Sequence, residues 1–342
     1  MNKIIKIIPL FFIFIVFSFS TNNPDIKNYE NIYLYLSQTG NYSYSGVEIG
    51  FSLLMKFSVF LGLDYYGFLI ILGTITTMLL YNFTVKYSNN PSVVLIMYII
   101  FPFFLEVVQI RNYLASLIVL NAITFLISKK YFKYCVAIIF ASLFHTTSLF
   151  YLLFVLVFFS KKKLLYIVLS ITGIYVVIQK YVFPKLLLLI PNGTKYIVYM
   201  DNAKITTTIL FIIYFFCSLI LILNLSRGAY ALNNQFNHLT DKQLSMIEMI
   251  EKINIIIVFS FALIALDINF FRLYRNIIIL NYILFSNTFY RYKVLKNSSI
   301  ISSQILFILF SLITGFFFLY YNQFESVVKT ILESIVFFSK AN

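Results

Sequence analysis

Several ionisable side chains of this sequence stand inside or beside apolar stretches, and five of them have types that could do chemistry: Glu48, Arg111, His145, Arg272 and Arg275. An arginine in strongly apolar surroundings faces a cavity, a partner or a lipid phosphate, and its planar fork of donors can hold a phosphate through two hydrogen bonds. A carboxylate or an imidazole can take a proton from a reacting hydroxyl group. These residue types therefore indicate phosphate binding next to acid–base chemistry.

The arginines also have ordinary structural interpretations. Arg111 follows Glu106 in the stretch FPFFLEVVQIRNYLASLIVLNAITFL. It could pair with that carboxylate, reach toward lipid head groups or hold a phosphate. Arg272 and Arg275 are three residues apart and so share a helix face. That spacing suits either a pair reaching for the membrane surface or a diphosphate ligand.

Glu48 and His145 are the candidate catalytic residues. Glu48 lies where YSGVEIGF returns from polar to apolar sequence, so it is either a charge favoured by a helix N-terminus or the base that deprotonates a sugar hydroxyl. His145 lies between two apolar runs in SLFHTTSLF. It is either a structural residue or a group that exchanges a proton, since an unperturbed imidazole has a pKa of about 6.5. The sequence does not choose between the two as the base.

Composition places all of these residues in a membrane protein. Hydrophobic residues make up 61% of the chain, charged residues 11%, and the mean hydropathy is +0.90. The net charge of +14 sits mostly in short clusters between apolar runs, as in cytoplasmic loops, so nucleic-acid binding is not expected. The chain has no Gly-rich phosphate loop, GxSxG or HExxH motif and no aspartate cluster of metal-ligand spacing, so we expect no cofactor and no metal.

Apolar runs predict an all-α, polytopic transmembrane bundle of about 11 to 12 membrane segments. Residues 1–20 have the lysines and apolar core of a signal peptide, but no A-x-A-like cleavage site follows, so we interpret them as an anchor. The shorter run 49–63 is interpreted as a re-entrant or interfacial helix. The predicted spans are 4–20, 67–84, 92–106, 112–128, 132–145, 147–159, 164–179, 205–226, 253–267, 270–288 and 300–321.

Lysine clusters predict the orientation of these spans. Lys129, Lys130 and Lys133 lie at one end of the pair of spans 132–159 and Lys161, Lys162 and Lys163 lie at the other, so this pair points outward with His145 at its tip. A helix of about 17 residues, rising about 1.5 Å per residue, then places Arg111 at the outer boundary. The basic residues after span 270–288 likewise place Arg272 and Arg275 outside.

We expect residues 1–342 to form one integral membrane domain with short connections. The predicted connections are an external loop at 21–48, an external loop at 180–204, a cytoplasmic loop at 227–251 and an interfacial amphipathic helix at 323–342.

Three motifs in order resemble a known family. VEIGF at 47–51, QIRNYLA at 109–115 and KKYFKYCVAIIFASLFHTTSLF at 129–150 are similar to the pattern E-P-G-F, I-R-Q-x-L-A, basic turn and A-x-x-x-H-x-S/T of the EpsG-like group of Wzy-type polysaccharide polymerases. The resemblance covers about residues 25–160 well. The sequence departs from it at Ile49, where the family has Pro, and at Asn112, where the family has Gln.

The resemblance implies a GT-C-like membrane glycosyltransferase at the outer face of the bacterial plasma membrane. Such an enzyme makes O-antigen, capsule or exopolysaccharide by moving a growing glycan from undecaprenyl diphosphate onto a lipid-linked repeat unit. The resemblance supports Glu48, Arg111 and His145 as functional residues. Diphosphate binding by Arg272 and Arg275 rests on the predicted topology alone. The implied partners are the undecaprenyl-diphosphate-linked oligosaccharide and the bilayer, with a chain-length regulator and a flippase as further candidates.

Three alternatives remain open at this point. The first is a flippase or transporter of the same lipid-linked oligosaccharide, although the charges gather near one face and no second half is recognisable. The second is a membrane O-acyltransferase that uses His145 as its base. The third is a purely structural membrane protein.

Overall fold

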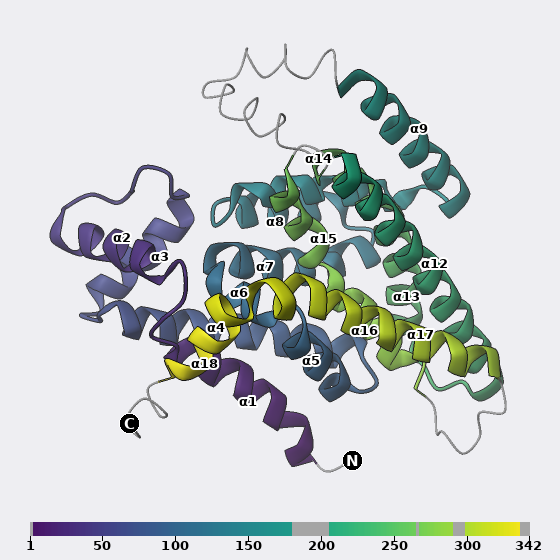
Figure 1. Ribbon diagram of the computed structural model, residues 1–342, viewed down its shortest axis with the longest axis horizontal. Coiled ribbons are helices and arrows are strands. Elements are labelled where there is room, and N and C mark those ends of the chain that lie inside the picture. Colours follow the sequence, from purple (N-terminus) through teal and green to yellow (C-terminus); the bar gives the residue numbers. More distant parts are fainter. Residues whose placement is uncertain (1–2, 180–204, 265–266, 290–297, 336–342) are drawn as a thin grey trace.

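The computed structural model describes residues 3–179, 205–264, 267–289 and 298–335, and Figure 1 shows that these residues form a bundle of helices. The prediction of an all-α, polytopic membrane protein is confirmed. Among the described residues, four helices are long and apolar enough to cross a membrane, and they are Tyr65–Tyr87, Ile110–Ile127, Ile213–Phe236 and Ser299–Tyr321. Shorter apolar helices accompany them, and the total of 11 to 12 membrane segments stays a prediction.

The described elements follow one another in the order of Figure 1. The first half of the chain contains α1 (Lys3–Phe19), α2 (Ile26–Gln38), α3 (Ile49–Phe60), α4 (Tyr65–Tyr87), α5 (Pro91–Ile100), α6 (Phe103–Val108), α7 (Ile110–Ile127), α8 (Tyr131–Ser142), the 3₁₀ helix η1 (Thr146–Phe158) and α9 (Lys161–Gln179). The second half contains α12 (Ile205–Phe236), α13 (Asp241–Ile256), η2 (Ile257–Phe259), α14 (Ser260–Ile264), η3 (Ile268–Phe271), α15 (Arg272–Arg275), α16 (Ile278–Asn287), α17 (Ser298–Gly315), the π-helical turns η5 (Phe316–Tyr321) and η6 (Phe324–Lys329), and α18 (Thr330–Glu333).

Two predicted spans are interrupted in the structure. The run 92–106 is split between α5 and α6, where Pro102 has no backbone N–H to continue the helix. The run 270–288 is split into η3, α15 and α16. Both interruptions lie beside buried polar side chains, because Glu106 follows the first and Asn276 stands at the second. Broken helices of this kind occur in membrane proteins where the backbone is surrounded by protein.

The predicted connections differ in part from the structure. The segment 21–48 contains α2, and most of the segment 227–251 is helical because α12 runs to Phe236 and α13 begins at Asp241. The Thr240 hydroxyl and the Gln243 side chain form a capping box that fixes the start of α13. Residues 180–204, where the second external loop is predicted, and the end of the predicted amphipathic helix at 336–342 lie outside the described residues.

α3 is too short to cross a membrane. Its 12 residues reach about 18 Å at about 1.5 Å per residue, against a hydrocarbon core of about 30 Å. One face packs Phe51 and Met55 inward while Phe57 and Phe60 are exposed, as expected for a helix lying at the interface. Lys56 ties α3 to the end of α2 by donating hydrogen bonds to the carbonyl oxygens of Leu36 at 2.7 Å and of Thr39 at 2.6 Å.

α16 lies in the centre of the bundle, between α5, α12 and α13, and all of its residues are buried. Buried polar groups are costly unless they are hydrogen-bonded, and those of α16 have partners on its neighbours. The Asn254 amide donates to Asn281 at 2.8 Å, the Ser286 hydroxyl contacts that of Ser88 at 2.6 Å, and the Asn287 amide donates to the Tyr87 carbonyl at 2.8 Å. These bonds fix α16 and thereby the two short helices that precede it.

Candidate functional site

Glu48 is the centre of a cluster formed by three segments that are far apart in the sequence. It is the N-cap residue of α3, but its carboxylate makes no hydrogen bond to its own helix. Arg111 Nη1 donates to Glu48 Oε2 at 2.6 Å, His145 Nδ1 lies 3.1 Å from Oε1, and the Thr146 backbone N–H donates to Oε1 at 3.0 Å. Glu48 therefore caps η1 of the neighbouring hairpin rather than the helix that it begins.

Gly50 allows this cluster to form. Its N–H donates to the Leu143 carbonyl oxygen at 2.8 Å, which joins the first turn of α3 to the turn between α8 and η1. A Cβ atom at Gly50 would lie 2.7 Å from that oxygen and 2.8 Å from the Leu143 Cβ, closer than van der Waals contact permits. Only glycine lets the two backbones approach this closely, and the approach brings Glu48 to His145.

Arg111 occupies the second position of α7, where a cation is disfavoured by the helix dipole. Its position is therefore explained by its partners and not by the stability of α7. Besides Glu48, it donates to the Gly46 carbonyl oxygen from Nη1 at 3.3 Å and to the Tyr29 hydroxyl from Nε at 3.4 Å. The guanidinium also lies 5.7 Å from the centre of the Tyr29 ring, within the range of a cation–π contact. Because these contacts use Nε and Nη1, Nη2 can donate to a ligand.

His145 presents one nitrogen to Glu48 and keeps the other available. Its Nδ1 faces the carboxylate, which favours the tautomer with the proton on Nδ1 and leaves Nε2 as an acceptor. Nε2 is buried and has no hydrogen-bond partner among the described residues. The side chains of Glu48, Arg111 and His145 are 15%, 20% and 13% exposed, so the cluster is shielded from solvent without being closed.

The surroundings of Glu48 stabilise its charged form. Burial alone would raise the pKa of the carboxyl group, but the hydrogen bonds from His145 and Thr146 and the charge of Arg111 outweigh burial and lower the pKa to about 2. Glu48 is therefore ionised at neutral pH and holds protons weakly. This favours an orienting and charge-balancing role for Glu48 and leaves the accepting nitrogen to His145.

Arg275 belongs to a second cluster on the inner side of the same turn of α7. Its Nε donates to Glu106 Oε1 at 2.8 Å and its Nη2 to Gln109 Oε1 at 2.7 Å. Asn112 donates to Glu106 Oε2 at 3.4 Å and exchanges amide hydrogen bonds with Asn276 at 2.8 and 2.9 Å. Glu106 and Arg275 are 1% and 7% exposed, so this ion pair is desolvated and depends on these additional hydrogen bonds.

Arg272 differs from the other two arginines in its partners. Its Nε donates to the Asn269 carbonyl oxygen at 2.9 Å, and no carboxylate in the described part of the chain lies within 4 Å of it. Asp267 instead accepts hydrogen bonds from Asn269 at 2.9 and 3.3 Å and shapes the η3 turn. Arg272 therefore has no ion-pair partner in the described part of the chain, although Asp267 and Glu106 lie close enough to interact with its charge.

A scan against protein families matches the EpsG family over residues 3–332, nearly the whole chain. The chain belongs to the EpsG family. This is a family of polysaccharide-polymerase-like membrane proteins, and the resemblance drawn from three motifs is thereby confirmed. No curated protein and no solved structure matches the chain.

In this EpsG protein the three residues singled out by the family motifs, Glu48, Arg111 and His145, contact one another around one carboxylate. Sequence reasoning missed Thr146 as a donor to that carboxylate and Gln109 as a partner of Arg275. Both stand next to motif residues. The sequence signal that could have indicated them is their position in the motifs, since Gln109 opens QIRNYLA and Thr146 follows His145 in FHTTS.

The ion-pair partners in this EpsG protein also differ from the pairing considered for Arg111. Glu106 pairs with Arg275 and Arg111 pairs with Glu48, so the two charges of the stretch 101–126 do not contact each other. The roles of Arg111, Arg272 and Arg275 as diphosphate ligands stay a prediction. The ion pair makes Arg275 less available to an anion than Arg272.

Proposed function

We propose that this EpsG protein polymerises polysaccharide by transferring a growing glycan from undecaprenyl diphosphate to a hydroxyl group of a second lipid-linked repeat unit, at the outer face of the bacterial plasma membrane. The observation that carries the proposal is that His145, whose buried Nε2 has no partner among the described residues, shares the Glu48 carboxylate with Arg111. A proton acceptor next to a phosphate-binding group is what a glycosyl transfer from a diphosphate requires.

In the proposed reaction, His145 Nε2 takes the proton of the acceptor hydroxyl as its oxygen forms a bond to the anomeric carbon of the donor sugar. The bond between that carbon and the diphosphate oxygen breaks, and its electron pair leaves with undecaprenyl diphosphate. Glu48 holds the Nδ1 proton of His145 and stabilises the imidazolium that forms, which keeps the base in the required orientation.

The charges of the site suit a leaving diphosphate. Glu48 offsets Arg111, and Glu106 offsets Arg275. Arg272 forms no ion pair in the described part of the chain, and His145 becomes positively charged when it takes the proton. Arg111 Nη2 and Arg272 are therefore the donors that we assign to the diphosphate, whereas Arg275 positions the segment 106–112 through Glu106 and Gln109.

One observation favours the flippase alternative. The helices interrupted between α5 and α6 and between α15 and α16 meet through buried polar side chains, and transporters bind substrates at such interruptions. The two functions differ in their products, since a flippase moves lipid-linked repeats without lengthening them.

The proposal is tested with purified protein in liposomes that contain undecaprenyl-diphosphate-linked repeat units. We expect glycans of increasing length on a gel, without any nucleotide sugar, and release of undecaprenyl diphosphate. Exchange of His145 for Ala is expected to slow chain growth strongly at unchanged protein level. Movement of single repeats across the bilayer without chain growth would establish the flippase instead.

A further inference from the structure

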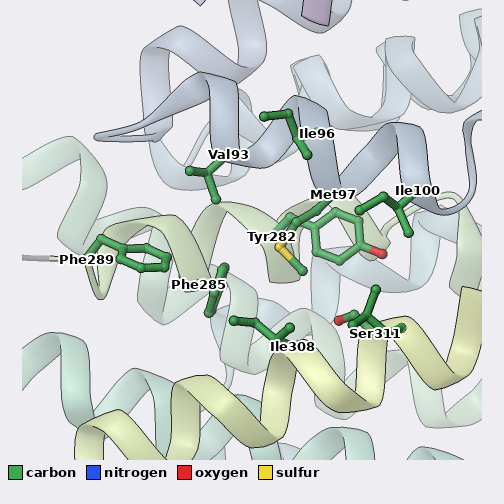
Figure 2. A pocket seen from close by; sticks show the side chains of 10 residues that line it. Val93, Ile96, Met97, Ile100, Tyr282, Phe285, Phe289, Ile308 and Ser311 are labelled. Carbon is green, nitrogen blue, oxygen red and sulfur yellow. The ribbon is translucent and has the colours of Figure 1, made fainter. Parts of the chain in front are cut away.

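Two apolar grooves lie on opposite faces of α17. The first, shown in Figure 2, lies between α5, α16 and α17, has a volume of about 250 Å³ and is lined by residues such as Ile96, Met97 and Phe285. The second lies between α12, η3 and the end of α17 and has a volume of about 350 Å³. Its lining includes Leu210, Tyr214, Ile268, Ile313, Phe317 and Phe318.

The second groove presents an apolar surface to an occupant. Its polar atoms are used internally, because the Thr314 hydroxyl donates to the Phe310 carbonyl oxygen at 2.8 Å and contacts the Tyr214 hydroxyl at 3.4 Å. Its floor is held by Phe318, whose ring stacks on that of Phe271 with centres 4.3 Å apart. Its rims at Leu210 and Phe317 are exposed. Such a groove fits an apolar chain that approaches from the membrane.

Only the second groove is joined to the candidate site. Ile268 lines it and begins η3, which leads directly into Arg272, and the Arg272 guanidinium folds back onto the Asn269 carbonyl oxygen. The first groove is lined by Tyr282 and Phe285 of α16 and by Phe289 just beyond it. Tyr282 stands ten residues beyond Arg272, whereas only four residues separate Ile268 from Arg272.

We propose that the groove between α12, η3 and α17 binds the isoprenoid chain of the lipid carrier while Arg272 holds its diphosphate. This rests on the proposed function and locates its donor. An occupant with an anionic head and a long apolar tail matches a guanidinium without an ion-pair partner among the described residues that stands four residues after Ile268 of an apolar groove. A carrier held at both points presents its anomeric carbon in one orientation.

The test compares Ile313→Trp, which fills the groove, with Leu309→Trp on the same helix, which lines neither groove. Ile313 and Leu309 are 55% and 49% exposed, so the two substitutions should affect the stability of α17 to a similar extent. Ile313→Trp is expected to raise the KM for the undecaprenyl donor by about tenfold, the effect of losing burial of about two CH₂ groups. It is expected to leave unchanged the KM for a donor whose tail is too short to reach the groove, and Leu309→Trp should leave both unchanged.

A photoreactive group at the tail of undecaprenyl diphosphate gives a second readout that does not depend on catalysis. We expect it to label α12 and α17 around Leu210 and Ile313, and to be displaced by unlabelled carrier but not by phosphatidylglycerol. Labelling around Ile96 in the first groove, or equal displacement by phosphatidylglycerol, overturns the groove assignment even if chain growth is observed. If Ile313→Trp does not fold, Leu210→Trp fills the groove from the opposite wall.

If wild-type protein lengthens neither donor, the proposed polymerase function fails, and the labelling pattern then decides separately whether the carrier occupies the groove.

Discussion

In the proposed mechanism, Glu48 acts through its contacts with His145 and Arg111 and not as the proton acceptor. Its pKa of about 2 makes it a weak base at neutral pH, whereas an imidazole is the usual proton acceptor in this range. The same carboxylate fixes the tautomer of His145 and holds Arg111. The sequence left the choice of base open, and the geometry favours His145.

Substitution of the two residues separates these roles. We expect His145→Ala to lower the rate of chain growth by about 10²- to 10⁴-fold, the usual contribution of a general base. Glu48→Gln is expected to lower the rate less, because the amide oxygen can still accept the hydrogen bond from His145 Nδ1–H although the negative charge is lost. Rates with lipid-linked repeats at equal protein level provide the measurement, and a larger loss in Glu48→Gln than in His145→Ala would reverse the assignment.

The lowered pKa of Glu48 also predicts how stability depends on pH. A carboxyl group whose pKa falls from 4.5 in the unfolded chain to about 2 in the folded protein stabilises the fold above pH 4.5. This contribution is lost as the pH falls from about 4.5 to about 2. Thermal unfolding in detergent should therefore show a steeper loss of stability over this range for the wild type than for Glu48→Gln. Parallel curves for the two proteins contradict the prediction.

At the scale of elements, the site depends on how the start of α3 meets the turn between α8 and η1. Gly50→Ala places a Cβ within 2.7 Å of the Leu143 carbonyl oxygen, and this backbone contact must open. We expect Glu48 to separate from His145, with chain growth strongly reduced and most of the fold retained. Gly40→Ala is the matched control, because a Cβ there meets no atom within 4 Å. Equal activity of the two variants in the polymerisation assay would show that glycine is not required at position 50.

The junction of α6 with α15 depends on the Glu106–Arg275 ion pair. Arg275→Met leaves a buried carboxylate without its partner, and we expect a loss of about 3–5 kcal/mol in the free energy of unfolding. Adding Glu106→Gln should restore part of this loss, because the uncompensated charge is removed. Chemical unfolding in detergent measures the free energy of unfolding of each variant, and hence the coupling between Arg275 and Glu106. The exposed pair Lys329–Glu325 serves for comparison, where Lys329→Met should cost far less because both charges are solvated.

At the scale of the whole molecule, the predicted orientation is open to direct measurement. Asn41, in the exposed connection between α2 and α3, is expected outside, and Lys162, at the start of α9, inside. In a protein with Cys135 and Cys217 replaced by Ser, a membrane-impermeant maleimide should label Asn41→Cys in intact cells and Lys162→Cys only after permeabilisation. The opposite pattern would place the cluster around Glu48 on the cytoplasmic side.

Composition and periodicity were sufficient to predict the all-α membrane fold, since a chain this apolar has few other ways to satisfy its backbone. The order of the three motifs identified Glu48, Arg111 and His145, which the structure brings together. Ion-pair partners could not be predicted in this way. Glu106 and Arg111 are close in sequence, but the break at Gln109 turns the carboxylate inward, toward an arginine from a segment far along the chain.

Apolar periodicity did not predict the broken helices either. The runs 92–106 and 270–288 are apolar enough to be predicted as single spans, yet both are interrupted where Glu106 and Asn276 meet partners from other helices. Pro102 marks the first break in the sequence itself, but the partner that Asn276 meets at the second break is distant in the sequence, and a single apolar run contains no information about it.

The polar side chains of α16 also bear on how the protein enters the bilayer during synthesis. An isolated segment carrying Asn281 and Asn287 would partition poorly into lipid. Each of these amides bonds to a partner from an earlier part of the chain, on α13 or at the end of α4, which the ribosome has already delivered. α16 can therefore insert by joining helices that are already in place, and its release from the translocon becomes coupled to tertiary assembly.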